Sequence, residues 1–105
     1  MKEHHDSRLT RNGYAPSIMQ DDYGVCYRCG TSSGKLDFHE IYGASNRQKS
    51  KRLGLWVTLC RRCHEDAHGH NSVIIALKQA GQTAAMQTYG WSTEEFIRQI
   101  GRNYL

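Results

Sequence analysis

Two pairs of cysteines constrain this chain more than any other feature. Cys26 and Cys29 form one C-x-x-C pair, and Cys60 and Cys63 form another. The two-residue gap lets a tight turn aim both sulfurs of a pair at one point, and two such pairs are typical of a tetrahedral Zn²⁺ site with four thiolates. A thioredoxin-like redox pair or free buried thiols are the alternatives, but redox pairs occur singly within a βαβ pattern that is absent here. The sequence therefore predicts a structural Zn²⁺ site.

Composition and length agree with a single small domain stabilised by a metal. The chain has 105 residues, of which 38% are hydrophobic, and a core that small gains folding free energy directly from metal binding. Lys and Arg number 14 against 10 Asp and Glu, a net charge of +4 that favours a polyanionic partner. The chain has no apolar run long enough for a membrane span, and its first residues lack the apolar segment of a secretory signal. We therefore expect a cytoplasmic protein and neither a membrane protein nor an exported one.

The chain divides into an arm and one domain. Residues 1–17 mix charges with Gly13 and the only proline, Pro16, and are expected to form a flexible N-terminal arm in which His4 and His5 are solvated. Residues 18–105 are expected to form the folded domain, of the α+β class. Its predicted elements are strands at Leu36–Ile41 and Leu55–Leu59, a basic loop at 43–54 with room for one helical turn, a helix after Cys60, a helix at 72–89, and a short helix after the capping box Ser92–Glu95.

Three histidines suggest a second metal site beside the cysteines. His64 and His68 are four residues apart on a predicted helix, so both imidazoles project from one face. A zinc ion shared by the two cysteine pairs would hold the strand that carries His39 against this helix. Three protein ligands would leave coordination positions open, as in catalytic sites. The alternative is that the helix histidines are surface residues, or that one of them replaces a cysteine ligand.

A basic segment lies between the strand and the histidine helix. Residues 47–62 contain six basic side chains and no acidic one. Such a run is often only a solvated surface, but its position between the candidate metal ligands favours a nucleic-acid backbone as partner. The predicted phosphate contacts are Arg47, Lys49, Lys51, Arg52 and Arg61.

The segments CYRCG and DFHEIYGASNRQKSKRLGLWVTLCRRCHEDAHG resemble the HNH nucleases of the ββα-metal class, especially the small HNH-type proteins of phages and prophages. Those proteins carry an H-[HE]-[IV]…G-x-x-N-R-x-K-S…G-L segment, and the closing FIRQIGRNYL is also similar to their ends. The resemblance covers about residues 18–105. It implies a zinc-stapled ββα-metal core with two C-terminal helices.

The resemblance also implies roles for individual residues. His39 takes the position of a metal ligand, Glu40 the position of the general base, and the helix histidines His64 and His68 the remaining ligand positions. Asn46 is the candidate for the asparagine that orients the base. Glu40 departs from the family pattern, because a glutamate is a weaker base at neutral pH than the histidine usually found there. Two alternatives follow: His39 itself is the base, with Asp37 and the helix histidines nearer the metal, or the chain is a weak nuclease that mainly binds DNA.

The expected function is metal-dependent hydrolysis of DNA phosphodiester bonds. A single unit reaches one strand, so a lone copy is expected to nick DNA. The catalytic metal is Mg²⁺, Mn²⁺, Ni²⁺ or Zn²⁺. The expected partner is DNA, for a monomer or a homodimer in a phage-infected bacterial cell, and the resemblance leaves room for a phage protein as a further partner. The alternative function is a zinc-stapled nucleic-acid-binding or adaptor module without catalysis.

Overall fold

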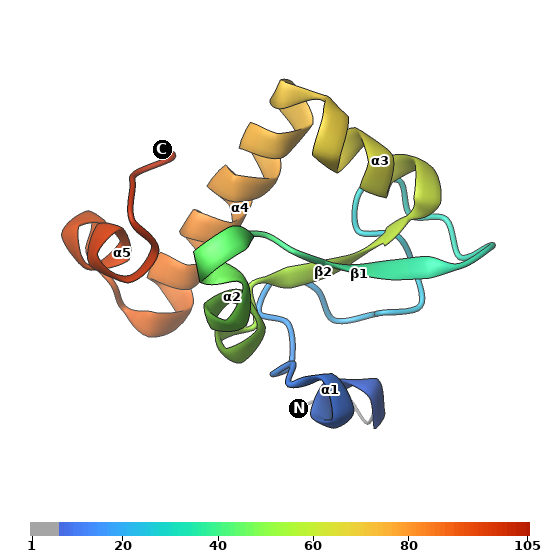
Figure 1. Cartoon of the computed structure of the whole chain (residues 1–105), viewed down its shortest axis with the longest axis horizontal. Coiled ribbons are helices and arrows are strands. Elements are labelled where there is room, and N and C mark those ends of the chain that lie inside the picture. Colours follow the sequence, from blue (N-terminus) through green and yellow to red (C-terminus); the bar gives the residue numbers. More distant parts are fainter. Residues whose placement is uncertain (1–6) are drawn as a thin grey trace.

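The computed structural model describes residues 7–105 and belongs to the α+β class, as the sequence predicts (Figure 1). In chain order the elements are helix α1 (Ser7–Asn12), strand β1 (Leu36–Glu40), the 3₁₀ turn η1 (Ala44–Asn46), helix α2 (Arg47–Leu53), strand β2 (Trp56–Cys60), and the helices α3 (Arg61–Gly69), α4 (Asn71–Tyr89) and α5 (Thr93–Ile100). Within this part of the chain, no helix combines the length and the apolar character that a membrane crossing requires.

The two strands form an antiparallel sheet that sets the direction of every candidate side chain on β1. His39 lies opposite Val57, and Glu40 lies opposite Trp56. Because successive side chains of a strand point to opposite faces, Asp37 and His39 share the face that carries α3, whereas Phe38 and Glu40 share the other face. Two sequence neighbours that the resemblance assigns to one active site therefore point in opposite directions.

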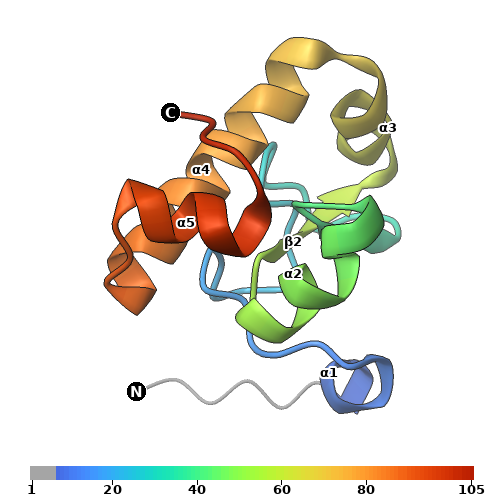
Figure 2. The ribbon, with the colours of Figure 1, turned by 60° about the vertical axis from the view of Figure 1, so that its left-hand side comes forward.

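One face of the sheet is covered by α3 and α4, which lie on the opposite side from α1 (Figure 2). The main core lies there and includes Val57 and Leu59 of β2, Ala67 of α3 and Leu77 of α4, with Phe96 of α5 extending it. Gly81 allows close approach, because a Cβ at this position would lie 3.0 Å from both Ile41 and the Tyr42 hydroxyl. The helix that carries two of the candidate histidines, α3, is thus fixed to the sheet by apolar burial.

The N-terminal segment covers the second face, which corrects the expectation of a flexible arm over its described part. Residues 7–17 include α1, and Leu9 packs in a second apolar cluster with Tyr23 and Trp56. The Trp56 indole donates to the carbonyl of Ala15 at 2.7 Å, and the Ser17 hydroxyl donates to the carbonyl of Trp56 at 2.6 Å. Both faces of β2 are therefore covered, which explains why its residues from Trp56 to Leu59 are all buried. The polar composition of residues 1–17 did not indicate this docking, because a few aromatic and aliphatic side chains are enough to hold the segment on the sheet. His4 and His5 lie outside the described residues.

The segment predicted as a basic loop contains more helix than expected. It forms η1 and then the two turns of α2, which end at Gly54 in the left-handed conformation, with a φ of 72°. A Cβ at Gly54 would clash with the carbonyl oxygen of Pro16. The buried Ser50 hydroxyl donates to the Tyr42 carbonyl at 2.7 Å and attaches α2 to the end of β1. This tertiary anchoring stabilises a helix that is too short to form on its own.

The C-terminal helices follow the predicted boundaries. The helix expected at 72–89 begins one residue earlier and ends at Tyr89, before Gly90, which is left-handed with a φ of 66°. The Ser92 hydroxyl accepts from the backbone N–H of Glu95 at 3.1 Å and caps α5 as the sequence predicts. The tail after α5 folds back on α4, where the buried Gln82 amide donates to Asn103 at 2.8 Å.

Candidate metal centres

The four cysteines come together at one end of the sheet. Cys26 and Cys29 belong to a loop whose backbone is tied to β2 by a bond from the N–H of Tyr27 to the Thr58 carbonyl at 2.8 Å. Cys60 ends β2, and Cys63 lies in the first turn of α3. All four Sγ atoms lie within 4.8 Å of one another. The predicted grouping of the two pairs is therefore confirmed.

The spacing of the sulfurs fits a tetrahedral zinc site. Four sulfurs at about 2.3 Å from a central ion lie about 3.8 Å from each other. The Sγ atoms of Cys29 and Cys60 are 3.8 Å apart. Cys26 and Cys63 are buried, whereas Cys29 is exposed, so the cluster sits at the edge of the core. This arrangement is compatible with a structural Zn²⁺ ion.

Without a bound cation, the four cysteine thiols do not all ionise readily. Burial, and after it the neighbouring thiols, raises the pKa of the Cys63 thiol to about 12. Burial also acts to raise the pKa of Cys26, but backbone N–H groups, that of Cys29 foremost, outweigh it and lower the value to about 6. Cys26 thus ionises readily, whereas burial opposes ionisation of Cys63. A bound cation would allow all four thiols to ionise.

Arg28 supplies a positive charge beside this cluster. Its guanidinium lies 3.7 Å from the Sγ atom of Cys63 and 2.9 Å from the carboxylate of Asp66. Four thiolates around one divalent ion carry a net charge of minus two. Arg28 would partly balance that charge, and the sequence alone gave no sign of this role.

The three histidines form a second cluster on the α3 face of the sheet. His39 projects from β1, and His64 and His68 project from successive turns of α3. The ring centroids are 5.2 Å apart for His39 and His64, 5.4 Å for His39 and His68, and 4.9 Å for the helix pair. One nitrogen from each ring lies within 4.8 Å of the others. The expected convergence of a strand histidine with the helix pair is therefore observed.

The distance between the helix histidines also fits a metal ion. Ligand nitrogens at about 2.0–2.1 Å in a tetrahedral site are separated by about 3.4 Å. The Nε2 atoms of His64 and His68 are 3.3 Å apart. Burial, followed by the charges of the two other histidines, lowers the pKa of His39 to about 4. His39 is therefore neutral at pH 7, which is the form that binds metals.

Asp37 acts on the outer side of this cluster. Its carboxylate lies 3.2 Å from the Nδ1 atom of His64, whereas the Nε2 atom of that ring faces His68. A carboxylate on the remote ring nitrogen fixes the tautomer and orientation of a metal-binding histidine. The structure thus places Asp37 behind a candidate ligand and not among the ligand atoms that converge.

Glu40 is held on the opposite face of the sheet. Its carboxylate accepts from the Tyr14 hydroxyl at 2.6 Å and from the Arg47 guanidinium at 2.7 Å, and its side chain is only 11% exposed. Burial, and then the bond to Glu40, raises the pKa of Tyr14. The structure does not bring the Glu40 carboxylate into the histidine cluster, and its role as general base stays a prediction.

Asn46 and most of the basic segment bond to other parts of the domain. Asn46 donates to the carbonyl of Ile100 at 2.7 Å, where it satisfies the end of α5. Lys49 donates to the carbonyl of Gln99, and Lys51 donates to the carbonyl of Asn12 at 3.1 Å. The remaining members of the predicted phosphate-binding set are Arg47, which pairs with Glu40, the exposed Arg52, and Arg61, whose Nε lies 3.7 Å from Asp37.

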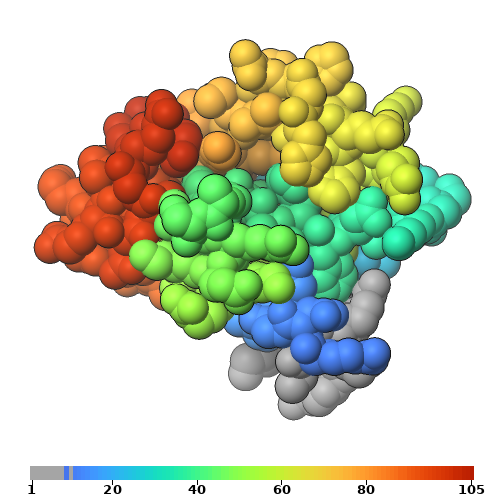
Figure 3. Space-filling view, in the orientation of Figure 1, coloured from blue at the N-terminus to red at the C-terminus, as the bar shows by residue number. Residues whose placement is uncertain are grey.

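Two cavities flank the histidine cluster and contain residues that the sequence analysis missed. One, of about 230 Å³, is lined by His39, Glu40, His68 and Lys78 among others, although the Glu40 carboxylate is bound to Tyr14 and Arg47. The other, of about 320 Å³, is lined by Arg61, His64, Glu65, His68 and Gly69. The sequence around Lys78 contains no motif that would have identified it, because it is one of several polar residues within the long helix α4. Glu65 does lie in a motif, because it follows His64 in an H-E-x-x-H pattern. In that pattern the glutamate acts as general base towards metal-bound water. The α3, α4 and β1 surfaces that surround the first cavity meet on the face shown in Figure 3.

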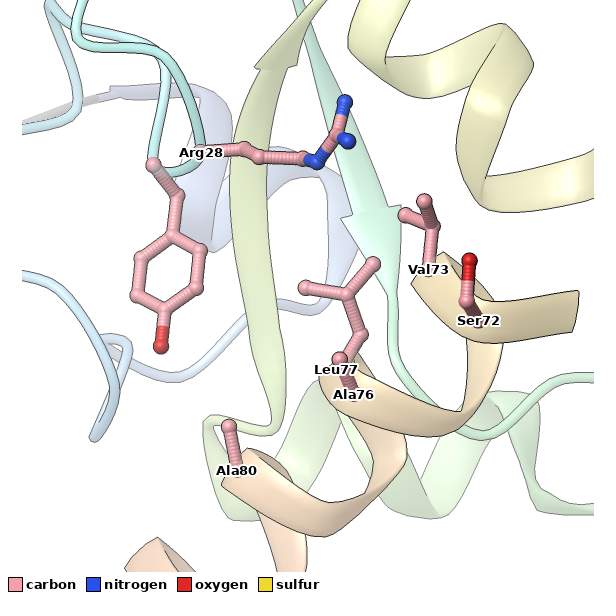
Figure 4. A pocket seen from close by; sticks show the side chains of 7 residues that line it. Arg28, Ser72, Val73, Ala76, Leu77 and Ala80 are labelled. Atoms are coloured by element: carbon pink, nitrogen blue, oxygen red, sulfur yellow. The ribbon is translucent and has the colours of Figure 1, made fainter. Parts of the chain in front are cut away.

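A larger cavity of about 670 Å³ lies between the first cysteine pair and α4. Figure 4 shows Arg28 on one side of this cavity and Ser72, Val73, Ala76, Leu77 and Ala80 of α4 on the other. Its floor is apolar, and its one charged side chain is already bound to Asp66. This cavity therefore offers no cluster of metal-binding or acid–base groups.

Comparisons with protein-family models, curated proteins and solved structures found no match to this chain. The functional assignment therefore depends on the geometry of the site.

Proposed function

We propose that this chain is a metal-dependent endonuclease of the HNH type that hydrolyses DNA phosphodiester bonds. The observation that carries the proposal is the convergence of three histidine nitrogens within 4.8 Å. Four-cysteine zinc sites are closed and structural, whereas a site with three protein ligands keeps positions open for water and substrate. The proposal assigns the cysteine cluster to a structural Zn²⁺ ion and the histidines to a catalytic divalent ion.

A divalent ion bound by the three histidines would neutralise the phosphate, lower the pKa of a bound water and stabilise the leaving 3′-oxygen. The chain's own residues prepare the site. Burial keeps His39 neutral, and Asp37 orients His64 from its remote nitrogen. Ala67, which stands between His64 and His68 in the sequence, is buried in the core. Its packing sets the rotation of α3 about its axis and thus the direction of the two histidines.

Basic side chains on both sides of the histidines provide the contacts to DNA in this proposal. Arg61 lines the cavity on one side, and Lys78 lines the cavity on the other. A strand that crosses the histidine cluster would meet one cation before the scissile phosphate and one after it. Such contacts position the backbone without reading bases. One domain reaches one strand in this arrangement, so nicking is the expected product of a single copy.

A second function is favoured by the placement of Glu40. Its carboxylate is bound by Tyr14 and Arg47 and is not among the atoms that converge with the histidine nitrogens, although the resemblance assigns the general base to this position. Without another base, the same fold would be a zinc-stapled module that binds DNA but does not cut it. The two functions differ in whether a metal-dependent activity exists.

Cleavage of supercoiled plasmid tests the proposal. The zinc-loaded chain is incubated with Mg²⁺, Mn²⁺, Ni²⁺ or Zn²⁺ and compared with His64→Ala and with the control His70→Ala. His70 lies just beyond α3, and its ring contacts Asp66 and not the cluster. We expect nicked plasmid only with added metal, loss of nicking in His64→Ala, and normal nicking in the control. A folded chain that retards DNA but never cuts it would support the binding module instead.

A further inference from the structure

The exposed surface of α3 carries more than the two metal-binding histidines. At 100° per residue, positions 61, 64, 65 and 68 of a helix fall within one sector of about 100°. Arg61, His64, Glu65 and His68 therefore share one side of α3, and all four line the same cavity. Cys63 and Ala67 occupy the opposite side and are buried. One helix thus brings a cation, two imidazoles and a carboxylate to one cavity.

Glu65 is the carboxylate in this region whose position suits a proton acceptor. Asp37 lies behind His64 and is also close to Arg61, and Asp66 is bound to Arg28. Glu40 is bound by Tyr14 and Arg47. Glu65, by contrast, is exposed, appears in no ion pair among the described residues, and lines the cavity together with both helix histidines.

We infer that Glu65 is the general base of the reaction, an inference that rests on the proposed function. In the step, one O–H bond of water breaks and the proton passes to the Glu65 carboxylate. The water oxygen forms a bond to phosphorus, and the bond from phosphorus to the 3′-oxygen breaks. The 3′-oxygen takes a proton from solvent, and Glu65 later returns its own proton to solvent. Arg61, on the same cavity, contacts the phosphate while this occurs.

The arrangement follows from the spacing of the helix. In an H-E-x-x-H segment the glutamate lies beside the two histidines that hold the metal, within reach of water on its open side. This assignment resolves the departure at Glu40. The strand supplies one ligand, and the helix supplies the other two ligands together with the base.

The experiment compares Glu65→Gln, Glu65→Ala and the control Glu94→Gln, an exposed glutamate on α5. Loss of a general base lowers the rate by about 10²–10⁴-fold. We expect Glu65→Gln to lose nicking by this factor, and formate to restore part of the rate of Glu65→Ala but none of His64→Ala. Metal affinity, measured by titration calorimetry with Mn²⁺, should match the wild type in Glu65→Gln and fall in His64→Ala.

Each outcome decides the inference. Normal nicking by Glu65→Gln, beside a wild type that cuts, overturns the role of Glu65 and leaves the nuclease proposal in place. A loss of Mn²⁺ affinity as large as that of His64→Ala makes Glu65 a ligand and also overturns the inference. If the wild type cuts DNA with none of the four added metals, both the nuclease proposal and the role of Glu65 as its base are refuted.

Discussion

The bonds of Glu40 allow a quantitative test of whether this residue is structural. Tyr14→Phe removes the 2.6 Å bond from the hydroxyl to the Glu40 carboxylate and leaves the ring in place. A hydrogen bond to a charged group contributes about 1.5–3 kcal/mol. The Arg47 pair adds less, about 0.2–1 kcal/mol, because the Arg47 side chain is 61% exposed. We therefore expect Tyr14→Phe to lower the free energy of unfolding by about 2 kcal/mol.

Glu40→Gln should have a similar cost, because the amide keeps the shape of the side chain but loses its charge. For a domain of this length, 1 kcal/mol corresponds to a shift in Tm of about 4–8 °C. Both variants should thus melt about 8–16 °C below the wild type in calorimetry. At a temperature where all three chains are folded, both should still nick plasmid.

The opposite result would refute this reasoning. If Glu40→Gln keeps the wild-type Tm but loses nicking a hundredfold, its carboxylate acts in the reaction and must leave Tyr14 and Arg47 to do so. Tyr14→Phe would then nick at least as fast as the wild type, because it frees the carboxylate.

Four further predictions concern the metal, the backbone, pH and DNA. Cys26→Ser should lose bound zinc, measured with a chromogenic chelator, together with the cooperative thermal transition, because zinc affinity contributes to folding. A non-glycine residue in the left-handed conformation costs about 1–2 kcal/mol. In urea unfolding, Gly34→Ala, with open space around it, should lower the free energy of unfolding by only that amount, whereas Gly54→Ala should lower it by more. Burial raises the pKa of Tyr42, so the folded chain keeps a proton that the unfolded chain releases near pH 10; stability should fall as the pH rises above about 10, and less so in Tyr42→Phe. Lys78→Ala should weaken binding of a DNA duplex and reduce the salt slope by about 1, which fluorescence anisotropy at several salt concentrations measures.

Much of the site is local in sequence and could be predicted. The two-residue gaps of the cysteine pairs and the four-residue gap between His64 and His68 determine geometry through one turn of backbone. Gly90 ends α4 and Ser92 begins α5, each through hydrogen bonds to residues close to it in the chain. Each of these features depends on residues within about four positions of each other, and therefore on helix and turn geometry alone.

The remaining features depend on contacts between distant segments. Which face of β1 meets α3 decides that His39 joins the helix histidines and that Glu40 does not, and this depends on the packing of Ala67 and Leu77 against β2. The docking of residues 7–17 on Trp56 gives Glu40 its partner Tyr14, 26 positions away. The sequence alone determined which residues can bind metal and in what pairs. The tertiary structure decided which carboxylates are bound and which remain open to water, because burial and pairing arise only when both faces of the sheet are covered.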